Sequence, residues 1–220
     1  MTPRKKKTDD AKLKAAMLQA ALKHVVFDGF TDKVLVGAAK EVGADKDAIR
    51  RLFPDGPLSL VEAFSESADA EMDRTLSAMD LKSMKIRARI AAAVMARIEA
   101  VRPHKEAARR AAAFLTLPPH AVLGAKLVYR TVDAMWRAAG DTSTDFNFYT
   151  KRGILAGVYS ATLMRWFTDT SPDENATTQF LADRIENVMQ FEKFKARLKR
   201  SFDRLPPLSE ILGSVNGRRG

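Results

Sequence analysis

Apolar residues recur at helical spacing along almost the whole chain, and the alternation typical of strands is nearly absent. Segments with apolar positions three or four residues apart are separated by Gly and Pro, which start or end helices. The pattern therefore predicts an all-α fold in which three short N-terminal helices precede a bundle of longer ones. The predicted helices span about residues 11–27, 32–41, 46–52, 57–79, 81–101, 103–117, 120–139, 144–168 and 173–204.

The first breaks between these segments carry specific start and stop signals. Gly29 ends the first predicted helix, and Gly43 turns the chain after the second. Thr31 and Asp45 are good N-cap residues for the second and third helices, and Pro57 stands at a first-turn position of the fourth. The three N-terminal helices have the size and spacing of a helix-turn-helix unit.

The pattern divides the chain into five parts. The boundaries follow changes in charge, apolar spacing and Pro content. The predicted parts are a basic disordered tail (1–10), helix-turn-helix-like N-terminal helices (11–80), a ligand-binding helical bundle (81–190), a membrane-binding amphipathic end of the long last helix (191–205) and a flexible tail (206–220).

The end of the last helix, FEKFKARLKRSFDRL at residues 191–205, separates apolar from basic side chains. At helical spacing its five large apolar residues fall within about 80° of one another. Two partners fit such a helix, namely the protein's own core or dimer contact and an anionic lipid surface; we expect the lipid surface. The candidate membrane-binding residues are Phe191, Phe194, Leu198, Phe202, Leu205, Lys193, Lys195, Arg197, Lys199 and Arg200.

Composition narrows the class of partner and the compartment. The chain has 220 residues, is 46% hydrophobic and carries a net charge of +10, which favours an anionic partner such as nucleic acid, an anionic membrane or a phosphorylated ligand. It has no cysteine, so disulfides and zinc–thiolate sites are excluded. No secretory signal and no 18-residue apolar run is present. We expect a cytoplasmic protein, peripheral on the inner face of the cytoplasmic membrane or, in a eukaryote, on the mitochondrial matrix side.

The sequence offers no arrangement of catalytic residues. His24, His104 and His120 are far apart and none has metal-ligand spacing, and the chain lacks a phosphate-binding glycine-rich loop. Asp141 and Asp145 could form a carboxylate pair, but they precede a predicted helix and are better explained as caps. We therefore predict no catalytic residue, no metal, no cofactor and no enzymatic activity.

The N-terminal segment AAKEVGADKDAIRRLFPDGPLSLVEAF resembles the TetR-type regulators in its turn and in its Phe-Pro exit. That resemblance implies DNA binding by the third helix and a ligand in the following bundle. Asp47 and Arg50 stand where those regulators usually have a small residue and a tyrosine, and Gly56 stands where they have a lysine. Arg50 and Arg51 remain as phosphate contacts. A DNA-binding repressor is thus the alternative function, and DNA is not the expected partner.

A second segment, AGDTSTDFNFYTKR at residues 139–152, resembles the signature of the ubiquinone-biosynthesis accessory family of TetR-like lipid-binding proteins. Phe148 and Lys151 are mild departures from that signature. HVVFDGFTDKVL, LTLPPHA and RIENVM, at residues 24–35, 115–121 and 184–189, also resemble family segments. The resemblance covers about residues 13–195 and is more specific than the likeness to the TetR regulators.

This resemblance implies an accessory role without catalysis. Family members hold an isoprenoid lipid or ubiquinone intermediate in the bundle, form homodimers, lie on membranes through a C-terminal helix and assist a di-iron quinone hydroxylase. The hydroxylase-binding patch of the family, carried over by position, corresponds to Leu123, Asp133, Trp136 and Arg137. Arg137 stands where an aromatic residue is common.

Helical periodicity also suggests which residues line a lipid cavity. A bundle rich in Ile, Met, Phe and Ala can enclose an apolar tail, and each candidate has an ordinary core position as its alternative. The candidates on inward faces are Ile90, Val94, Phe114, Met135, Leu155 and Tyr159.

Overall fold

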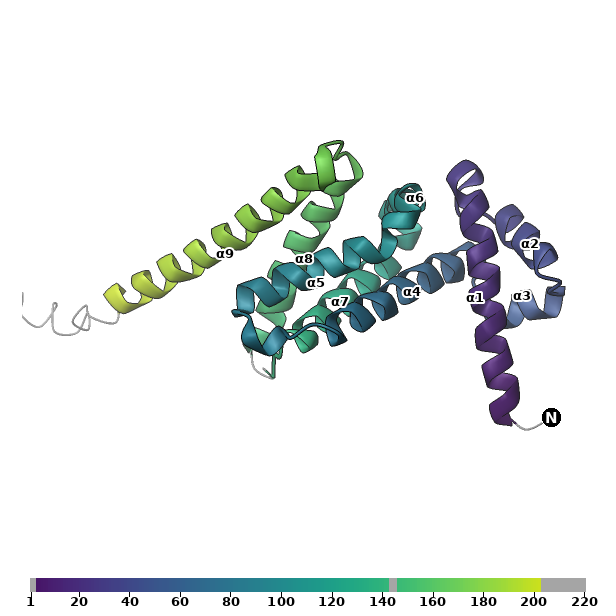
Figure 1. Cartoon of the computed structure of the whole chain (residues 1–220), viewed down its shortest axis with the longest axis horizontal. Helices are drawn as coiled ribbons and strands as arrows, with labels where there is room; N and C mark the ends of the chain where they lie inside the picture. Colours follow the sequence, from purple (N-terminus) through teal and green to yellow (C-terminus); the bar gives the residue numbers. More distant parts are fainter. Residues whose placement is uncertain (1–2, 143–145, 203–220) are drawn as a thin grey trace, which may run out of the picture. The chain divides into compact units, whose positions relative to one another are not determined.

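The computed structural model describes the backbone of residues 3–142 and 146–202 and the side-chain surroundings of residues 9–142 and 148–190. The described part is helical and contains no strand, which confirms the predicted all-α fold (Figure 1). The chain divides into two units, Met1–Leu181 and Ala182–Gly220, and α9 begins in the first of them. The helices are α1 (Pro3–Asp28), α2 (Asp32–Glu41), α3 (Lys46–Leu52), α4 (Pro57–Ser77), α5 (Ile86–Val101), α6 (Lys105–Thr116), α7 (Ala121–Ala138), α8 (Phe146–Phe167) and α9 (Asn175–Phe202), with 3₁₀ turns η1 (Leu81–Ser83), η2 (Arg102–His104), η3 (Pro118–His120) and η4 (Pro172–Glu174).

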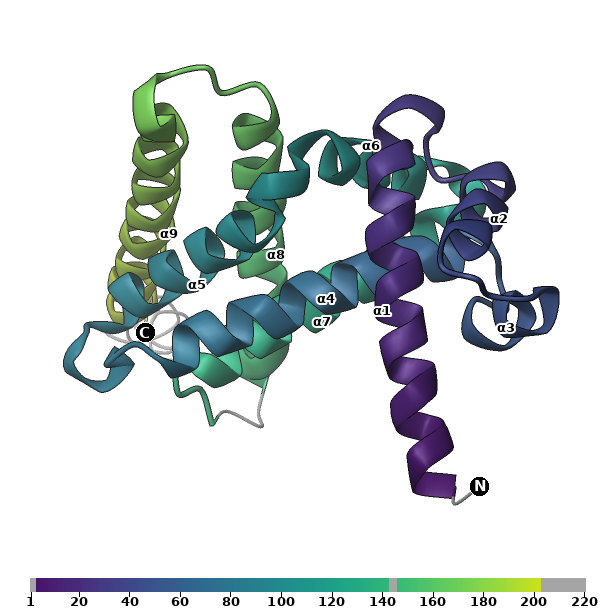
Figure 2. The same ribbon diagram turned by 45° about the vertical axis from the view of Figure 1, so that its right-hand side comes forward.

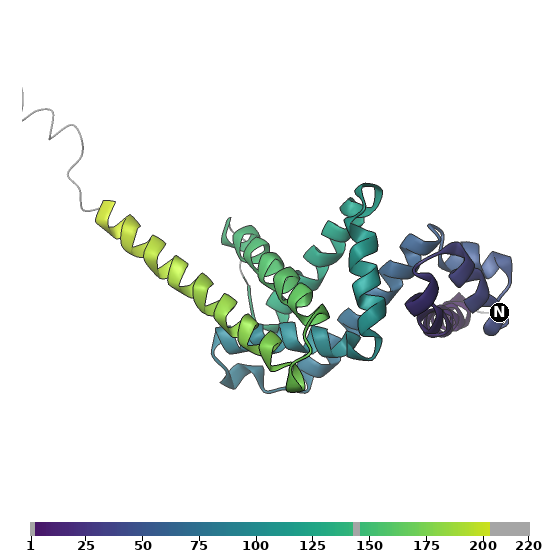
Figure 3. The same ribbon diagram turned by 90° about the horizontal axis from the view of Figure 1, so that it is seen from above.

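Helices α1, α2 and α3 pack on one another at one end of α4 (Figure 3). Met17, Ala21 and Val25 recur every four residues along α1 and are fully buried, so one face of α1 forms the centre of this group. The predicted caps are confirmed: Thr31 accepts a hydrogen bond from the Val34 amide at 3.3 Å, and Asp45 accepts one from the Ala48 amide at 2.7 Å.

The bundle is built around α7, which packs against α4, α5, α6 and α8. Figure 2 shows α4 and α7 running side by side. The largest buried side chains come from several helices: Leu60 and Met72 of α4, Ile98 of α5, Met135 of α7 and Trp166 of α8 are each less than 2% exposed. Burial of these apolar side chains is the main stabilising contribution to the bundle.

A row of rings joins the N-terminal helices to the bundle. The ring of Phe30, between α1 and α2, lies 6.3 Å from the rings of both Phe64 and Phe114. The imidazole of His120 stacks on Phe114 with 4.1 Å between ring centres, and His104 meets Phe64 edge-on. Burial lowers the pKa of His104, so this imidazole stays neutral at pH 7.

The structure corrects two predicted helix boundaries. The helix predicted from residue 11 begins at Pro3, because Pro suits the first helical turn and no helix-breaking residue follows before Gly29. The helix predicted from residue 81 begins at Ile86, after η1. Arg89 donates to the carbonyls of Lys82, Met84 and Ala139, so these carbonyls are satisfied outside a continuous helix.

Within the described ranges, no helix taken alone combines the length and apolar character needed to cross a bilayer. One pair bent by 95°, Ile86–Thr116 with Pro118–Ala138, passes the same criterion by length and composition. Its apolar residues include Val94, Ile98 and Leu127, which are buried in the bundle.

Asp169 connects the end of α8 to the start of α9. Its carboxylate accepts from the amide and hydroxyl of Ser171 at 2.9 and 2.6 Å. It also accepts from the amide and hydroxyl of Thr177 at 2.7 and 2.5 Å. The bonds from Ser171, followed by those from Thr177, hold the pKa of Asp169 well below its usual range.

Replacement of Asp169 by Asn is expected to destabilise the protein in a pH-dependent way. A carboxylate with a lowered folded-state pKa contributes stability above its unfolded pKa of about 4, and this contribution is lost as the pH falls toward the folded-state value. Urea unfolding at several pH values should therefore show a wild-type advantage at pH 7 that shrinks below about pH 4. The exposed Asp47→Asn is the control; a difference independent of pH would contradict this assignment.

Candidate functional site

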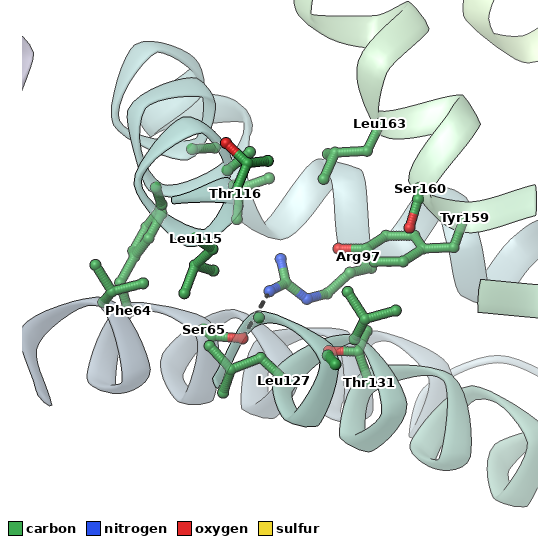
Figure 4. A pocket seen from close by; sticks show the side chains of 18 of the residues that line it. Phe64, Ser65, Arg97, Leu115, Thr116, Leu127, Thr131, Tyr159, Ser160 and Leu163 are labelled. Carbon is green, nitrogen blue, oxygen red and sulfur yellow. Dashed lines mark hydrogen bonds between the residues drawn. The ribbon is translucent and has the colours of Figure 1, made fainter. Parts of the chain in front are cut away.

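A cavity of about 410 Å³ lies inside the bundle between α4, α5, α6, α7 and α8 (Figure 4). Its volume falls within the range of small-molecule sites. Most of its wall is apolar, and the apolar lining residues are Val61, Phe64, Val101, Ala108, Ala111, Ala112, Leu115, Ala121, Gly124, Ala125, Leu127, Val128, Leu163 and Met164. The polar lining residues are Ser65, Arg97, Thr116, Thr131, Tyr159 and Ser160.

The guanidinium of Arg97 is the charged group of this wall and is buried. Its Nε donates to Asp69 Oδ1 of α4 at 2.8 Å, and its Nη2 donates to Ser65 Oγ at 3.4 Å. The hydroxyl of Thr131 on α7 donates to the same Asp69 oxygen at 2.9 Å. Three helices thus share one buried ion pair, which borders the cavity.

Tyr159 of α8 lies beside this ion pair with only 4% of its surface exposed. Its hydroxyl points toward the guanidinium of Arg97 in Figure 4. Burial raises the pKa of the Tyr159 hydroxyl, while the positive charge of Arg97 acts in the opposite direction. The phenol is therefore protonated at neutral pH and can donate a hydrogen bond.

The predicted lipid-lining residues are only partly brought together at this cavity. Tyr159 belongs to its lining, whereas the other five do not. Ile90, Val94, Met135 and Leu155 are buried core residues, and Phe114 stacks on His120. Periodicity identifies the inward face of a helix, but it does not show which inward residues leave a void between them.

Arg152 forms a second buried ion-pair network, between the end of α7 and the start of α8. This side chain is 3% exposed, and it contacts Asp133 Oδ1 at 2.7 Å and Asp141 Oδ2 at 3.1 Å. Lys151 pairs with the other oxygen of Asp141 at 2.9 Å. The guanidinium of Arg152 also lies over the ring of Phe148, 3.4 Å from its centre.

Three of the four predicted hydroxylase-binding residues, Asp133, Trp136 and Arg137, lie at this network, whereas Leu123 lies near the start of α7. Trp136 is half-buried, and its indole donates to the Lys151 carbonyl at 3.1 Å. Leu123 is also half-buried, and Arg137 is exposed and pairs with Asp133. The carboxylate of Asp133 is 10% exposed and is shared between Arg137 and Arg152. The predicted cap Asp141 is likewise a member of the ion-pair network.

Part of the positive charge of the helix-turn-helix-like unit is paired with carboxylates of the same protein. Arg51 of α3 donates to both carboxylate oxygens of Asp10 on α1, at 3.2 and 2.9 Å. Arg50 is exposed and lies 3.5 Å from Asp47 on the same helix. Of the two predicted phosphate contacts, Arg51 is therefore occupied by a partner within the protein.

Sequence reasoning missed Arg97, Asp69 and Arg152 as site residues. A signal for them exists, because Arg97 continues the apolar face of Ile90 and Val94 at helical spacing. A charged residue at such an inward position implies a buried partner. The partner itself lies 28 residues away along the chain and becomes evident only in the folded protein.

Comparison with known proteins shows which fold and which family this chain resembles. A crystal structure of a TetR transcriptional regulator from Nitrosomonas europaea superposes with a TM-score of 0.65 at 18% identity, covering 80% of this chain and 97% of that one. The sequence model of the COQ9 family matches residues 121–192. Ubiquinone biosynthesis protein COQ9, mitochondrial, from Rattus norvegicus is 32% identical over 180 residues, which are 79% of this chain and 57% of that protein. The Homo sapiens protein of the same name is 30% identical over 187 residues, 82% of this chain and 58% of that protein.

The fold defines an all-α protein of TetR-like architecture with a cavity in its bundle. The chain belongs to the COQ9 family of ubiquinone biosynthesis proteins. This confirms the family predicted from AGDTSTDFNFYTKR. The chain spans less than two thirds of the length of these relatives, at 57% and 58%.

Removal of the Arg152 charge is expected to be strongly destabilising. Arg152→Met leaves two buried carboxylates without their shared partner, and loss of one member of a buried ion pair costs about 3–5 kcal/mol in unfolding free energy. Urea denaturation should show this loss. The same substitution at exposed Arg165 of α8 is the matched control, and its effect should stay within about 0.5 kcal/mol. Equal stabilities of the two variants would rule out a structural role for the network.

Proposed function

We propose that the protein is a non-enzymatic lipid-binding accessory protein of ubiquinone biosynthesis. It holds an isoprenoid lipid or ubiquinone intermediate in the bundle cavity and presents it to a di-iron hydroxylase. The observation that carries this proposal is the largely apolar cavity of about 410 Å³ in a chain of the COQ9 family. An isoprenoid tail is poorly accommodated in water, and an apolar cavity offers it a favourable environment.

Membrane association is the second part of the proposal. Backbone helix α9 continues to Phe202, so the stretch that carries the predicted membrane-binding residues up to Phe202 is helical. The side chains of residues 191–202 and the whole of Leu205 lie outside the described residues. Their sequence supports the proposal, because each Lys or Arg near anionic headgroups contributes about 1 kcal/mol and each fully buried large apolar side chain about 1.5–3 kcal/mol. The membrane is the inner face of the cytoplasmic membrane, or the matrix side of the mitochondrial inner membrane.

The docking surface for the hydroxylase is proposed around Trp136, Leu123 and Arg137. The Arg152 network at the end of α7 that carries Trp136 and Arg137 fixes the orientation of Trp136 through the Lys151 carbonyl. Asp133 acts through this network rather than as a direct contact. A homodimer is proposed from the family resemblance.

The TetR-like fold supports one alternative, a DNA-binding repressor with a ligand in the bundle. Native mass spectrometry with extraction of co-purifying lipid separates the two functions. A bound isoprenoid or quinone supports the accessory role. A lipid-free protein that shifts duplex DNA at physiological salt supports the repressor, and Arg50→Ala should then weaken DNA binding.

Filling the cavity is expected to expel the lipid. Ala112 of α6 lines the cavity, and Ala112→Leu places a larger side chain in the space that the ligand occupies. The amount of co-purifying lipid per protein, measured by mass spectrometry, should fall severalfold. The adjacent Ala113 is exposed and absent from the lining, so Ala113→Leu is the matched control and should retain the lipid. Equal lipid content in both variants would place the lipid outside the cavity.

One substitution on each side of the α9 end tests membrane binding. Leu198 lies on the apolar face of the sequence pattern and Ala196 lies about 160° away, so Leu198→Asp and Ala196→Asp add the same charge to opposite faces. Leu198→Asp should weaken sedimentation with anionic phosphatidylglycerol vesicles at least tenfold, because an apolar anchor is lost. Ala196→Asp should have a much smaller effect. Similar losses in both variants would indicate attraction by charge without insertion.

A further inference from the structure

The connection between α4 and α5 exposes apolar side chains next to lysines. It reads MDLKSMKIR over residues 79–87, and Figure 2 shows it at the end of α4 that lies away from α1, α2 and α3. Met79 and Ile86 are 38% and 44% exposed, and Leu81 and Met84 between them are half-buried. Single exposed apolar residues are common on protein surfaces, whereas apolar residues gathered in one short segment mark an interaction site.

Hydrogen bonds hold this connection in one shape. The guanidinium of Arg89 donates to the carbonyls of Lys82 and Met84 at 3.1 and 3.0 Å. It also donates to the carbonyl of Ala139, just after α7, at 2.9 Å. The amide of Met84 donates to the carbonyl of Leu81 at 3.1 Å. The exposed apolar side chains therefore stand on a fixed backbone, which lowers the entropy lost when a partner binds them.

The charge of the connection indicates the kind of partner. Lys82 and Lys85 are exposed, and neither forms an ion pair with the residues whose side chains the structure describes. In the sequence between Met79 and Arg89, Asp80 is the only acidic residue. Protein interfaces are depleted of lysine, and a symmetric contact between two copies would bring like charges together. Lysines beside apolar side chains instead suit the headgroups of an anionic bilayer.

We propose that residues 79–87 form a membrane-contact site on the bundle itself. Met79 and Ile86 insert among the lipid acyl chains of an anionic bilayer, and Lys82 and Lys85 lie at the lipid headgroups. The proposal rests on the proposed membrane association and adds to it a second contact, separate from the end of α9.

This contact bears on how the bundle is oriented at the bilayer. Leu81 of the connection and Arg137 of α7 line one cleft of about 370 Å³ between α4 and α7. Arg89 joins the connection to Ala139 at the same end of α7. A bilayer bound at residues 79–87 thus lies close to the end of α7 that carries Trp136, which belongs to the proposed hydroxylase-docking surface.

Single-cysteine labelling tests the insertion directly, because the chain contains no cysteine of its own. Met79→Cys and Ile86→Cys, each in the full chain and each carrying the dye NBD, are mixed with phosphatidylglycerol vesicles. The emission of both labels should shift to the blue and rise severalfold, and lipids with a nitroxide in the acyl chain should quench it. Val36→Cys on α2, where the native side chain is 56% exposed, is the matched control and should show neither change.

Removal of the lysines tests the headgroup contact by vesicle sedimentation. Each lysine close to an anionic surface strengthens binding about fivefold, so Lys82→Gln combined with Lys85→Gln should weaken binding to phosphatidylglycerol vesicles about twentyfold. Lys40→Gln combined with Lys46→Gln removes the same charge from exposed positions of α2 and α3. This control should weaken binding about twofold at most, because salt screens charges that lie far from the bilayer.

Labels at positions 79 and 86 that respond no more than the label at position 36 would overturn the inference and leave the end of α9 as the membrane anchor. A response that appears without vesicles, when the protein concentration is raised or the hydroxylase is added, would overturn it in favour of a protein contact. Equal losses from the two lysine pairs would also overturn it, because net charge alone would then explain binding. A wild type that fails to sediment with the vesicles would overturn the proposed membrane association as well.

Discussion

Charge burial is the constraint on which the rest of this structure depends. An arginine among apolar helices is tolerated only when a carboxylate and further hydrogen bonds compensate it. Arg97 meets this condition through Asp69 and Ser65, and Thr131 binds the same carboxylate from a third helix. The pair therefore fixes α4, α5 and α7 in one mutual arrangement. In a bundle held by apolar contacts alone, the helices could move together and fill the cavity. Here the guanidinium of Arg97 must stay paired with Asp69, so the helices keep the positions that leave Arg97 in the cavity wall.

The same constraint explains what the family signature does in this chain. Asp141 and Arg152, near the two ends of AGDTSTDFNFYTKR, meet at 3.1 Å. Arg152 also binds Asp133, so the first turns of α8 are held to α7. Because Trp136 bonds to the carbonyl of Lys151, the position of this indole follows from the network. A segment that resembles the family signature in sequence thus contributes an ion-pair network that holds α8 to α7.

The fold could largely be predicted from the sequence because its signals are local. The sequence identifies Thr31 and Asp45 as N-caps and Gly43 as a turn residue. The structure confirms all three. The start of α5 could not be predicted, because Arg89 satisfies carbonyls that include one 50 residues away. The position of the cavity was even harder to predict from the sequence. Periodicity selects inward faces, which identified Tyr159, but a void is defined by the distances between helices, and these depend on distant pairs such as Arg97 and Asp69.

The ring row gives the cavity a mechanical connection to the N-terminal helices. Phe64 belongs to the cavity lining and its ring lies 6.3 Å from that of Phe30, at the junction of α1 and α2. A ligand that displaced Phe64 would therefore press on this junction, since close-packed rings transmit displacement. In a regulator such a displacement would reach the DNA-reading helix. In this chain α3 has Arg51 held by Asp10 and carries acidic Asp45 and Asp47 at its start, while Lys46 and Arg50 of the same helix stay exposed.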